Sequence, residues 1–502
     1  MSVRASQAAT RRPIPLRRRA SNLVLRWQAR LDAAWADRFI PWMVAACLFV
    51  VYTALALARA HTLDAGSALG GHLQAAWLIT EGRAAEVTVT GNHLLADNLP
   101  VAFYPVAWLT EWVRAQPLLL GLQSAAIAVG VVPIWRIARS VVHLRVGAAA
   151  ALVVAYGVHP SVNSLNLSDF HPEAMAVAPL LAATAAALQH RWRHYACFSL
   201  LAVAWNADVG LVIAGLGILL VLEGRTRVGL LSVALGGGWT ALAVLVLEPR
   251  WGMAGLVTPG AFTDYGDSAL DVLIAMVQNP IRVLGDVVAE PNLAVIVGLL
   301  APVLFLPVLA PRYLVPALPL QLLYLVADVP ITGAQGAEHT VPGVVFCFVA
   351  AAFALTGLGR RSVERVLVDR RVLIGVVVAS LSFWAVDGGS SPYRAPWRWR
   401  HTDEIDEARH AAARLVGERG SVRASGSLLP LLAERVEVRS LERTAHDADA
   451  AGERVDAVIL DSHWARWSTE DVRAFSDGLE QDGFDLVYQI RGISVFERVG
   501  AG

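Results

Sequence analysis

Long apolar runs separated by short polar connections occupy most of this 502-residue chain. A helix needs about 20 apolar residues to cross a bilayer. About eleven runs predict spans, at residues 40–58, 116–135, 146–160, 173–188, 195–207, 209–222, 228–247, 292–310, 312–327, 341–358 and 372–386. Several are shorter than a perpendicular helix requires, and short or interrupted spans often surround a cavity. The pattern predicts a polytopic α-helical membrane protein.

Arginine positions give the predicted orientation of these spans. Basic residues concentrate in cytoplasmic connections, and residues 136–145, 189–194, 223–227 and 359–371 all contain arginine. We therefore expect the N-terminus inside and the C-terminus outside, with outer loops that include 59–115 and 248–291. Residues 1–38 would form a basic cytoplasmic arm and residues 39–386 the membrane domain, in a multi-pass protein of the plasma (inner) membrane.

The last part of the chain, residues 387–502, is charged and compatible with water. Amphipathic periodicity predicts helices at 404–419 and 469–482. Short β-branched runs at 422–424, 436–438 and 455–460, with a hairpin at Arg491-Gly492, predict strands. This segment is expected to form a small extracytoplasmic α/β domain.

Composition supports the membrane class and excludes others. Hydrophobic residues make up 56% of the chain, charged residues only 17%, and the formal net charge is zero. No basic excess therefore indicates nucleic-acid binding. The three cysteines lie in apolar runs, so neither a disulfide framework nor a zinc spacing is present. No phosphate-binding glycine motif lies where ATP-driven transport or a soluble cofactor would need it.

Candidate chemistry concentrates at Asp169-Phe170-His171-Pro172-Glu173, where the chain leaves and re-enters the bilayer. Ionisable groups at membrane depth are costly and usually face a cavity or a site. A carboxylate in a partly apolar cleft has a raised pKa, which suits a general base. The outer acids considered for this role are Asp64, Asp97, Asp169, Glu173 and Asp208. Alternatively these acids are solvated or cap helices, and Pro172 preceded by Asp169 is a favourable helix start.

The signature stretch resembles the "DFHPEALA" motif of the membrane-protein family DUF2079. The segments Leu69-Gly70, Gln74-Ala75, Asp208-Val209-Gly210 and His339 fall in register with weaker motifs of that family. The family in turn resembles the GT-C glycosyltransferases. That resemblance implies a polyprenyl-phosphate sugar donor, a catalytic carboxylate in or near the first outer loop, and an envelope glycan, lipid or protein acceptor.

The resemblance implies roles for particular residues. Asp64 or Asp97 would act as the base, and Asp169 and His171 would shape the catalytic site. Glu173, Asp208 and His339 would line it, and Mg²⁺ or Mn²⁺, if present, would bind Asp169, His171 and Glu173. Outer arginines would hold the donor phosphate, with Arg83, Arg114, Arg250 and Arg282 as candidates. The expected partners are membrane lipid, a polyprenyl-phosphate sugar and the acceptor.

The chain departs from the family pattern where acids are expected. The two first-loop acids fall on Ala68 and Leu73, and the Lys-Glu pair before Asp208 falls on Asn206 and Ala207. The histidine expected after Asp97 is Asn98. These departures leave open a non-catalytic protein that carries lipid or glycan or assists assembly. A secondary transporter would predict an internal repeat, and no convincing repeat is found.

Overall fold

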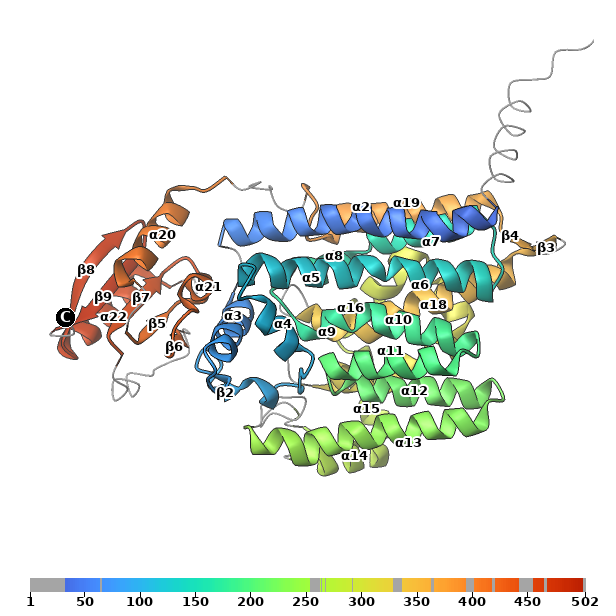
Figure 1. Ribbon diagram of the computed structural model, residues 1–502, viewed down its shortest axis with the longest axis horizontal. Coiled ribbons are helices and arrows are strands. Elements are labelled where there is room, and N and C mark those ends of the chain that lie inside the picture. The colour runs from blue at the N-terminus through green and yellow to red at the C-terminus, as the bar shows by residue number, and fades with distance from the viewer. Residues whose placement is uncertain are drawn as a thin grey trace, which may run out of the picture.

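Helices aligned with the long axis form most of the molecule, and a smaller α/β domain lies at one end of them (Figure 1). The computed structural model describes residues 32–63, 66–252, 262, 264–266, 268–290, 292–327, 336–362, 365–393, 401–417, 420–441, 455–464 and 467–499. Most of the predicted basic arm lies outside these residues. Its last part, 34–38, already belongs to the first described helix.

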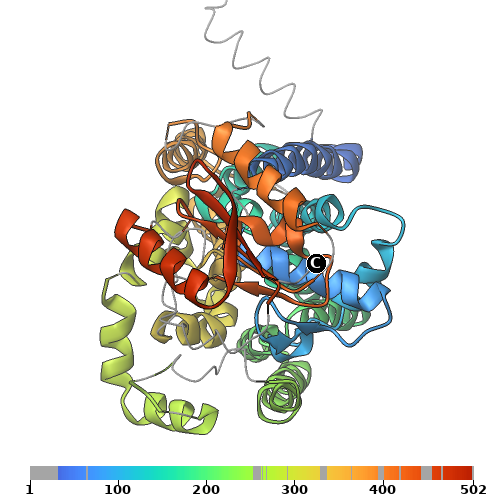
Figure 2. The same ribbon diagram turned by 90° about the vertical axis from the view of Figure 1, so that its left-hand side faces the viewer.

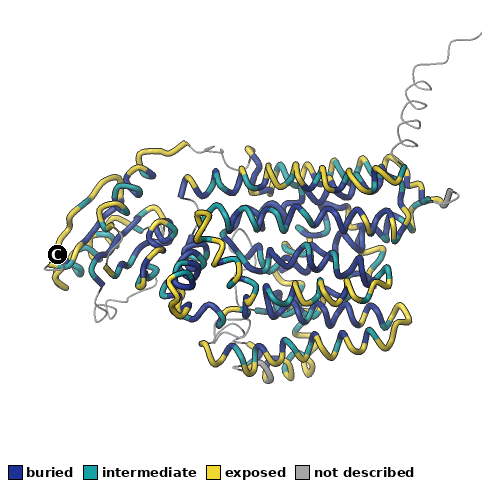
Figure 3. Tube along the Cα trace, in the orientation of Figure 1, coloured by how far each residue is buried: buried dark blue, intermediate teal, exposed yellow. Residues whose placement is uncertain are grey.

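The helical domain contains a helix in every segment predicted to span. The helices of these segments include α2 (Ala34–His61), α5 (Ala115–Val129), α6 (Val131–Arg136), α7 (Val146–Gly157), α8 (Pro160–Leu167), α10 (Val177–Leu188), α11 (Trp192–Trp205), α12 (Val209–Leu222), α13 (Thr226–Leu242), α16 (Asn292–Leu300), α17 (Leu318–Val326), α18 (Val341–Leu358) and α19 (Arg370–Asp387). Residues inside the bundle are buried, whereas many residues of α2 and α13 are exposed (Figure 3). Apolar exposed side chains are expected where lipid is the solvent.

Fewer helices than predicted are long enough to cross a bilayer alone. By length and composition, four described helices qualify: Ala34–His61, Ala115–Val141, Thr226–Arg250 and Glu338–Leu358. Two bent pairs raise the number to six if each pair forms one span. The polytopic helical class is thus confirmed, while the count of eleven and the orientation stay predictions.

The predicted spans at 292–310 and 312–327 are broken into short helical pieces. After α16, the chain forms 3-10 turns at Ala301–Val303, Leu306–Leu309, Pro311–Tyr313 and Val315–Ala317 before α17 begins. Each turn contains a proline, which lacks the N–H that a continuous helix requires. Counting apolar length alone overlooked these interruptions.

The predicted outer loops contain further structure. The first holds α3 (Ser67–Thr80), a hairpin of β1 (Glu86–Val87) and β2 (Asn92–His93), and the short helix α4 (Phe103–Leu109). The second holds α14 (Ala269–Gln278) and α15 (Pro280–Val288). A second hairpin, β3 (Arg360–Ser362) and β4 (Arg365–Leu367), lies at the opposite end of the bundle (Figure 1).

The C-terminal domain has a five-stranded sheet with the order β6-β5-β7-β9-β8. Its elements are α20 (Glu404–Val416), β5 (Val422–Ala424), α21 (Leu429–Leu432), β6 (Val438–Ser440), β7 (Ala457–Asp461), α22 (Thr469–Gln481), β8 (Phe484–Ile490) and β9 (Ile493–Arg498). Strand β5 pairs in parallel with β6 and β7, and β9 is antiparallel to β7 and β8. The predicted strands and helices agree with these bounds to within a few residues. Figure 2 shows the sheet in front of the helical bundle.

Helix α3 joins the two domains. Gln74, fully buried, donates to the carbonyl oxygens of Arg435 and Val436 at 3.3 and 3.2 Å. Gly70 packs so closely on α21 that an added Cβ would lie 2.7 Å from the Cβ of Leu429. One apolar cluster includes Leu69 of α3 together with residues of the sheet. The α/β domain is therefore docked on the bundle through α3.

Candidate functional site

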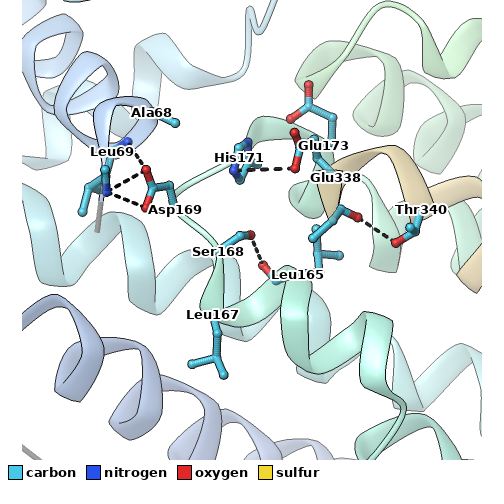
Figure 4. A network of polar contacts seen from close by, with 12 residues as sticks. Ala68, Leu69, Leu165, Leu167, Ser168, Asp169, His171, Glu173, Glu338 and Thr340 are labelled. Carbon is cyan, nitrogen blue, oxygen red and sulfur yellow. Dashed lines mark hydrogen bonds and ion pairs between the residues drawn. The ribbon is translucent and has the colours of Figure 1, made fainter. Parts of the chain in front are cut away.

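The signature loop between α8 and α9 (Pro172–Met175) carries Asp169 and His171 in opposite directions (Figure 4). The Asp169 carboxylate accepts from the Gly66 N–H at 2.8 and 2.9 Å, and from the Leu69 N–H at 3.4 Å. These groups begin α3, whose N-terminus attracts negative charge. Asp169 therefore acts as a cap supplied from 103 residues along the chain.

A buried glutamine on α5 fixes the backbone of the same loop. The Gln123 amide donates to the carbonyl oxygens of Leu165 at 3.0 Å and Asp169 at 3.2 Å. Its oxygen accepts from the His171 N–H at 2.8 Å. Gln123 is fully buried, and it supplies the hydrogen-bond partner of the Asp169 carbonyl oxygen and of the His171 N–H. The Leu165 carbonyl oxygen also accepts from Ser168 Oγ at 3.0 Å. Gln123 therefore fixes the position of the His171 backbone, from which the side chain extends.

Glu173 receives hydrogen bonds from two asparagines that lie far apart in the sequence. Its Oε1 accepts from Asn98 Nδ2 at 3.1 Å and Asn206 Nδ2 at 2.9 Å. Asn206 Oδ1 accepts from the Asp208 N–H at 2.7 Å, which helps to begin α12. Asn98 has a left-handed backbone with φ of 58°, a conformation that asparagine tolerates better than most residues. The two departures from the family pattern at 98 and 206 thus act together on Glu173.

A cavity of about 250 Å³ lies between the first outer loop, the signature loop and the start of α18. Its ionisable lining residues are His72, His93, Asp97, His171, Glu173, Glu338 and His339. His171 Nε2 lies 3.8 Å from a Glu338 carboxylate oxygen, and the His339 ring lies 4.5 Å from that of Tyr324. Glu338 Oε2 and His339 Nδ1 are buried without hydrogen-bond partners among the described residues. Such groups can accept or donate bonds to a polar ligand.

The protonation of the cavity residues follows from their surroundings. The Asp97 side chain is accessible from the cavity, yet much of it is surrounded by protein. This desolvation, together with the nearby Glu173 and Glu248 carboxylates, raises the pKa of Asp97 to about 7. Burial alone would lower the pKa of His171, yet Glu338, Glu173, Asp169 and Asp97 raise it overall. Burial lowers the pKa of His72. The cavity therefore combines a carboxylate whose pKa is raised to about 7 with a histidine whose pKa the surrounding carboxylates raise.

Asp97, His171, Glu173 and His339 are the predicted residues that the structure brings to one cavity. Asp208 is 1% exposed, and both its carboxylate oxygens lack hydrogen-bond partners within the described part of the chain. It does not line the cavity, and burial raises its pKa well above the usual value. Asp64 lies outside the described residues.

Other predicted roles are not supported. Arg83, Arg114 and Arg250 are exposed and do not line the cavity, and Arg282 pairs with Asp264 at 2.9 Å. No three His, Cys, Asp or Glu side chains in the described ranges are placed to hold a metal ion. Asp169 bonds to α3, away from His171 and Glu173, so the suggested metal set does not assemble (Figure 4). Asp169 is better described as a positioning residue than as a catalytic one.

Sequence reasoning missed Gln123, whose polar side chain inside an apolar span was the available signal. His72 lines the cavity while its Nδ1 contacts the Ala68 carbonyl oxygen at 2.8 Å, which leaves Nε2 to accept. Ala68, where the family pattern has an acid, lines the same cavity.

The described fold and site define a polytopic helical membrane protein with an α/β domain docked beside a cavity rich in histidines and carboxylates. The chain belongs to the family described as "Predicted membrane protein (DUF2079)", whose sequence profile matches residues 60–495. The comparison with curated proteins finds no similar sequence.

The fold is similar to that of ArnT from Cupriavidus metallidurans, which has a GT-C fold. The crystal structure of that protein bound to undecaprenyl phosphate matches with a TM-score of 0.53 and 10% identity, over 93% of this chain and 99% of ArnT. Its apo structure matches with a TM-score of 0.48 and 12% identity, over 90% and 98% of the two chains. At this identity the likeness concerns the fold, and it confirms the expected GT-C resemblance.

Proposed function

We propose that this protein is a glycosyltransferase of the plasma membrane that moves a sugar from a polyprenyl-phosphate donor to an acceptor in the cell envelope. The single observation that carries the proposal is the cavity that Asp97 and His171 line together. A fold similar to that of a protein crystallised with undecaprenyl phosphate supports a polyprenyl lipid as the donor's carrier.

Asp97 would serve as the general base. Its carboxylate takes the proton of the acceptor hydroxyl while the acceptor oxygen attacks the anomeric carbon of the sugar. The bond from that carbon to the phosphate oxygen breaks, and polyprenyl phosphate leaves with the bonding electrons. A pKa near the working pH lets the carboxylate be ionised and still basic enough to accept this proton.

His171 would stabilise the leaving phosphate. The surrounding carboxylates raise its pKa and so stabilise the imidazolium form, and its side chain is held at the cavity by the backbone bond to Gln123. A cation aimed at developing negative charge lowers the barrier to its departure. Glu173 and Glu338 would accept hydrogen bonds from sugar hydroxyls, since Glu338 has an oxygen without a hydrogen-bond partner among the described residues.

A non-catalytic lipid or glycan carrier is the second candidate. The observation that favours it is Ala68, which occupies the cavity wall where the family pattern has an acid. A carrier would bind the polyprenyl-phosphate sugar in the same cavity without breaking the glycosidic bond.

Sugar transfer by the purified protein tests both candidates. Radiolabelled polyprenyl-phosphate sugars and cell-envelope acceptors would be incubated with wild type, Asp97→Asn, His171→Gln and, as a control, Asp485→Asn on the exposed side of β8. The enzyme predicts acceptor labelling by wild type and the control, with a loss of about 100-fold or more in the Asp97 variant. Donor binding without labelling in any form would indicate the carrier.

A further inference from the structure

A second cavity, of about 300 Å³, lies at the other end of the bundle from the His171 cavity. Helices α2, α5, α6, α10 and α11 contribute its lining, which is mostly alanine and larger apolar side chains. Trp42 and Leu201 line it and are 51% and 44% exposed, so the cavity reaches the surface of the bundle as a groove. Its walls would face lipid in a membrane.

Three basic side chains line one end of this groove. Arg136 ends α6, Arg191 precedes α11, and His194 lies in the first turn of α11. Both arginines are exposed, and neither has an ion-pair or hydrogen-bond partner for its side chain among the described residues. Nearby Arg139 differs, because it is buried and paired with Asp32 and Asp37, each at 2.6 Å.

The described residues that line the groove include no group that would neutralise these cations. No aspartate or glutamate belongs to its described lining. Among the described residues, no side chain caps the N-terminus of α11, where Arg191 is the N-cap residue. The partial positive charge of that helix end therefore adds to the two guanidinium groups. The groove is apolar along its length and, among the described residues, ends in the unpaired guanidinium groups of Arg136 and Arg191. It fits an amphiphile with an anionic head group, because arginine binds phosphate in a bidentate manner.

We propose that this groove binds an anionic glycerophospholipid. The lipid phosphate contacts Arg136 and Arg191, and an acyl chain lies along the alanines of α10, including Ala182. The apolar walls favour a lipid over free phosphate, since free phosphate would leave the apolar walls of the groove without a ligand in contact with them. The site is separate from the His171 cavity and does not depend on sugar transfer.

Lipid retention measured by native mass spectrometry tests the proposal. The full-length protein would be reconstituted into nanodiscs made of equal parts phosphatidylglycerol and phosphatidylcholine. It would then be released into detergent, and the lipids that remain bound would be identified. We expect wild type to retain phosphatidylglycerol, and Arg136→Gln/Arg191→Gln to retain roughly tenfold less, as expected for the loss of charge-assisted hydrogen bonds. Ala182→Leu, which narrows the groove without changing its charge, should also reduce the amount of phosphatidylglycerol retained.

The control Arg193→Gln/Arg227→Gln removes the same charge from exposed positions that do not line the groove. It should retain lipid as wild type does, and thermal unfolding in phosphatidylcholine nanodiscs would show that all variants are folded. Equal retention of the two lipids by wild type would overturn the proposal. So would equal loss in the control, or stabilisation of the detergent-solubilised protein by inorganic phosphate to the same extent as by phosphatidylglycerol.

Discussion

The Asp169 side chain forms hydrogen bonds with the N-terminus of α3 and does not line the cavity. Its carboxylate accepts from Gly66 at 2.8 and 2.9 Å. Replacement by alanine should therefore lower the free energy of unfolding by about 1 to 2 kcal/mol, as for loss of a helix cap. Thermal unfolding of the purified protein would measure this, with Asp477→Ala on the exposed side of α22 as the control. A stable Asp169→Ala protein that cannot transfer sugar would instead indicate direct catalysis.

Gln123 links the loop backbone to α5 through three hydrogen bonds. Gln123→Leu keeps the side-chain volume but leaves the Asp169 carbonyl oxygen and the His171 N–H without their partner, whereas the Leu165 carbonyl oxygen keeps its bond from Ser168 Oγ. We expect a loss of about 2 to 4 kcal/mol in unfolding free energy, together with reduced sugar transfer because His171 is released. Gln123→Glu retains an acceptor for the His171 N–H and should retain more activity than Gln123→Leu. Equal activity in the two variants would contradict this role.

At the scale of elements, α3 connects the α/β domain to the cavity. Its Gly70 packs against Leu429 of the α/β domain, and its Ala68 and His72 line the cavity. Gly70→Ala would place its Cβ 2.7 Å from that of Leu429, and we expect a loss of about 1 to 3 kcal/mol from overpacking. Gly121 on α5 is the matched control, because an added Cβ there meets nothing within 4 Å. Thermal unfolding should show Gly121→Ala neutral or slightly stabilised. Similar destabilisation of both variants would remove the argument for close docking.

Local sequence patterns predicted the elements well where they depend on nearby residues. Apolar length located the helices, and β-branched runs located the strands of the α/β domain. Prolines at 302, 307, 311 and 316 divided two predicted spans, because apolar length does not record missing N–H donors.

The site was predicted less completely because its contacts join distant segments. Glu173 binds Asn98 and Asn206, which lie 75 and 33 residues away. Asp169 was weighed as a cap for the helix that starts at Pro172, yet it caps α3 instead. Residue type indicated which side chains could matter, but only the tertiary fold decides which of them share a cavity.

At the scale of the whole molecule, the predicted orientation places the α/β domain outside the cell and the arginine-rich connections inside. In a Cys47→Ala/Cys197→Ala background, Asp485→Cys on β8 should react with a membrane-impermeant maleimide in intact cells. Arg227→Cys, in the first turn of α13 at the other end of the bundle, should react only after permeabilisation. Both positions are exposed, so access depends on the side of the membrane. The reverse labelling pattern would place the His171 cavity in the cytoplasm.

The dependence of sugar transfer on pH, compared between wild type and Asp97→Asn, tests the central claim most directly. A general base works only when deprotonated, so the wild-type rate should rise with pH and level off above a pKa of about 7. Asp97→Asn should be about 100-fold or more slower and lose this rise. A variant that transfers sugar at the wild-type rate with the same pH profile would contradict the account.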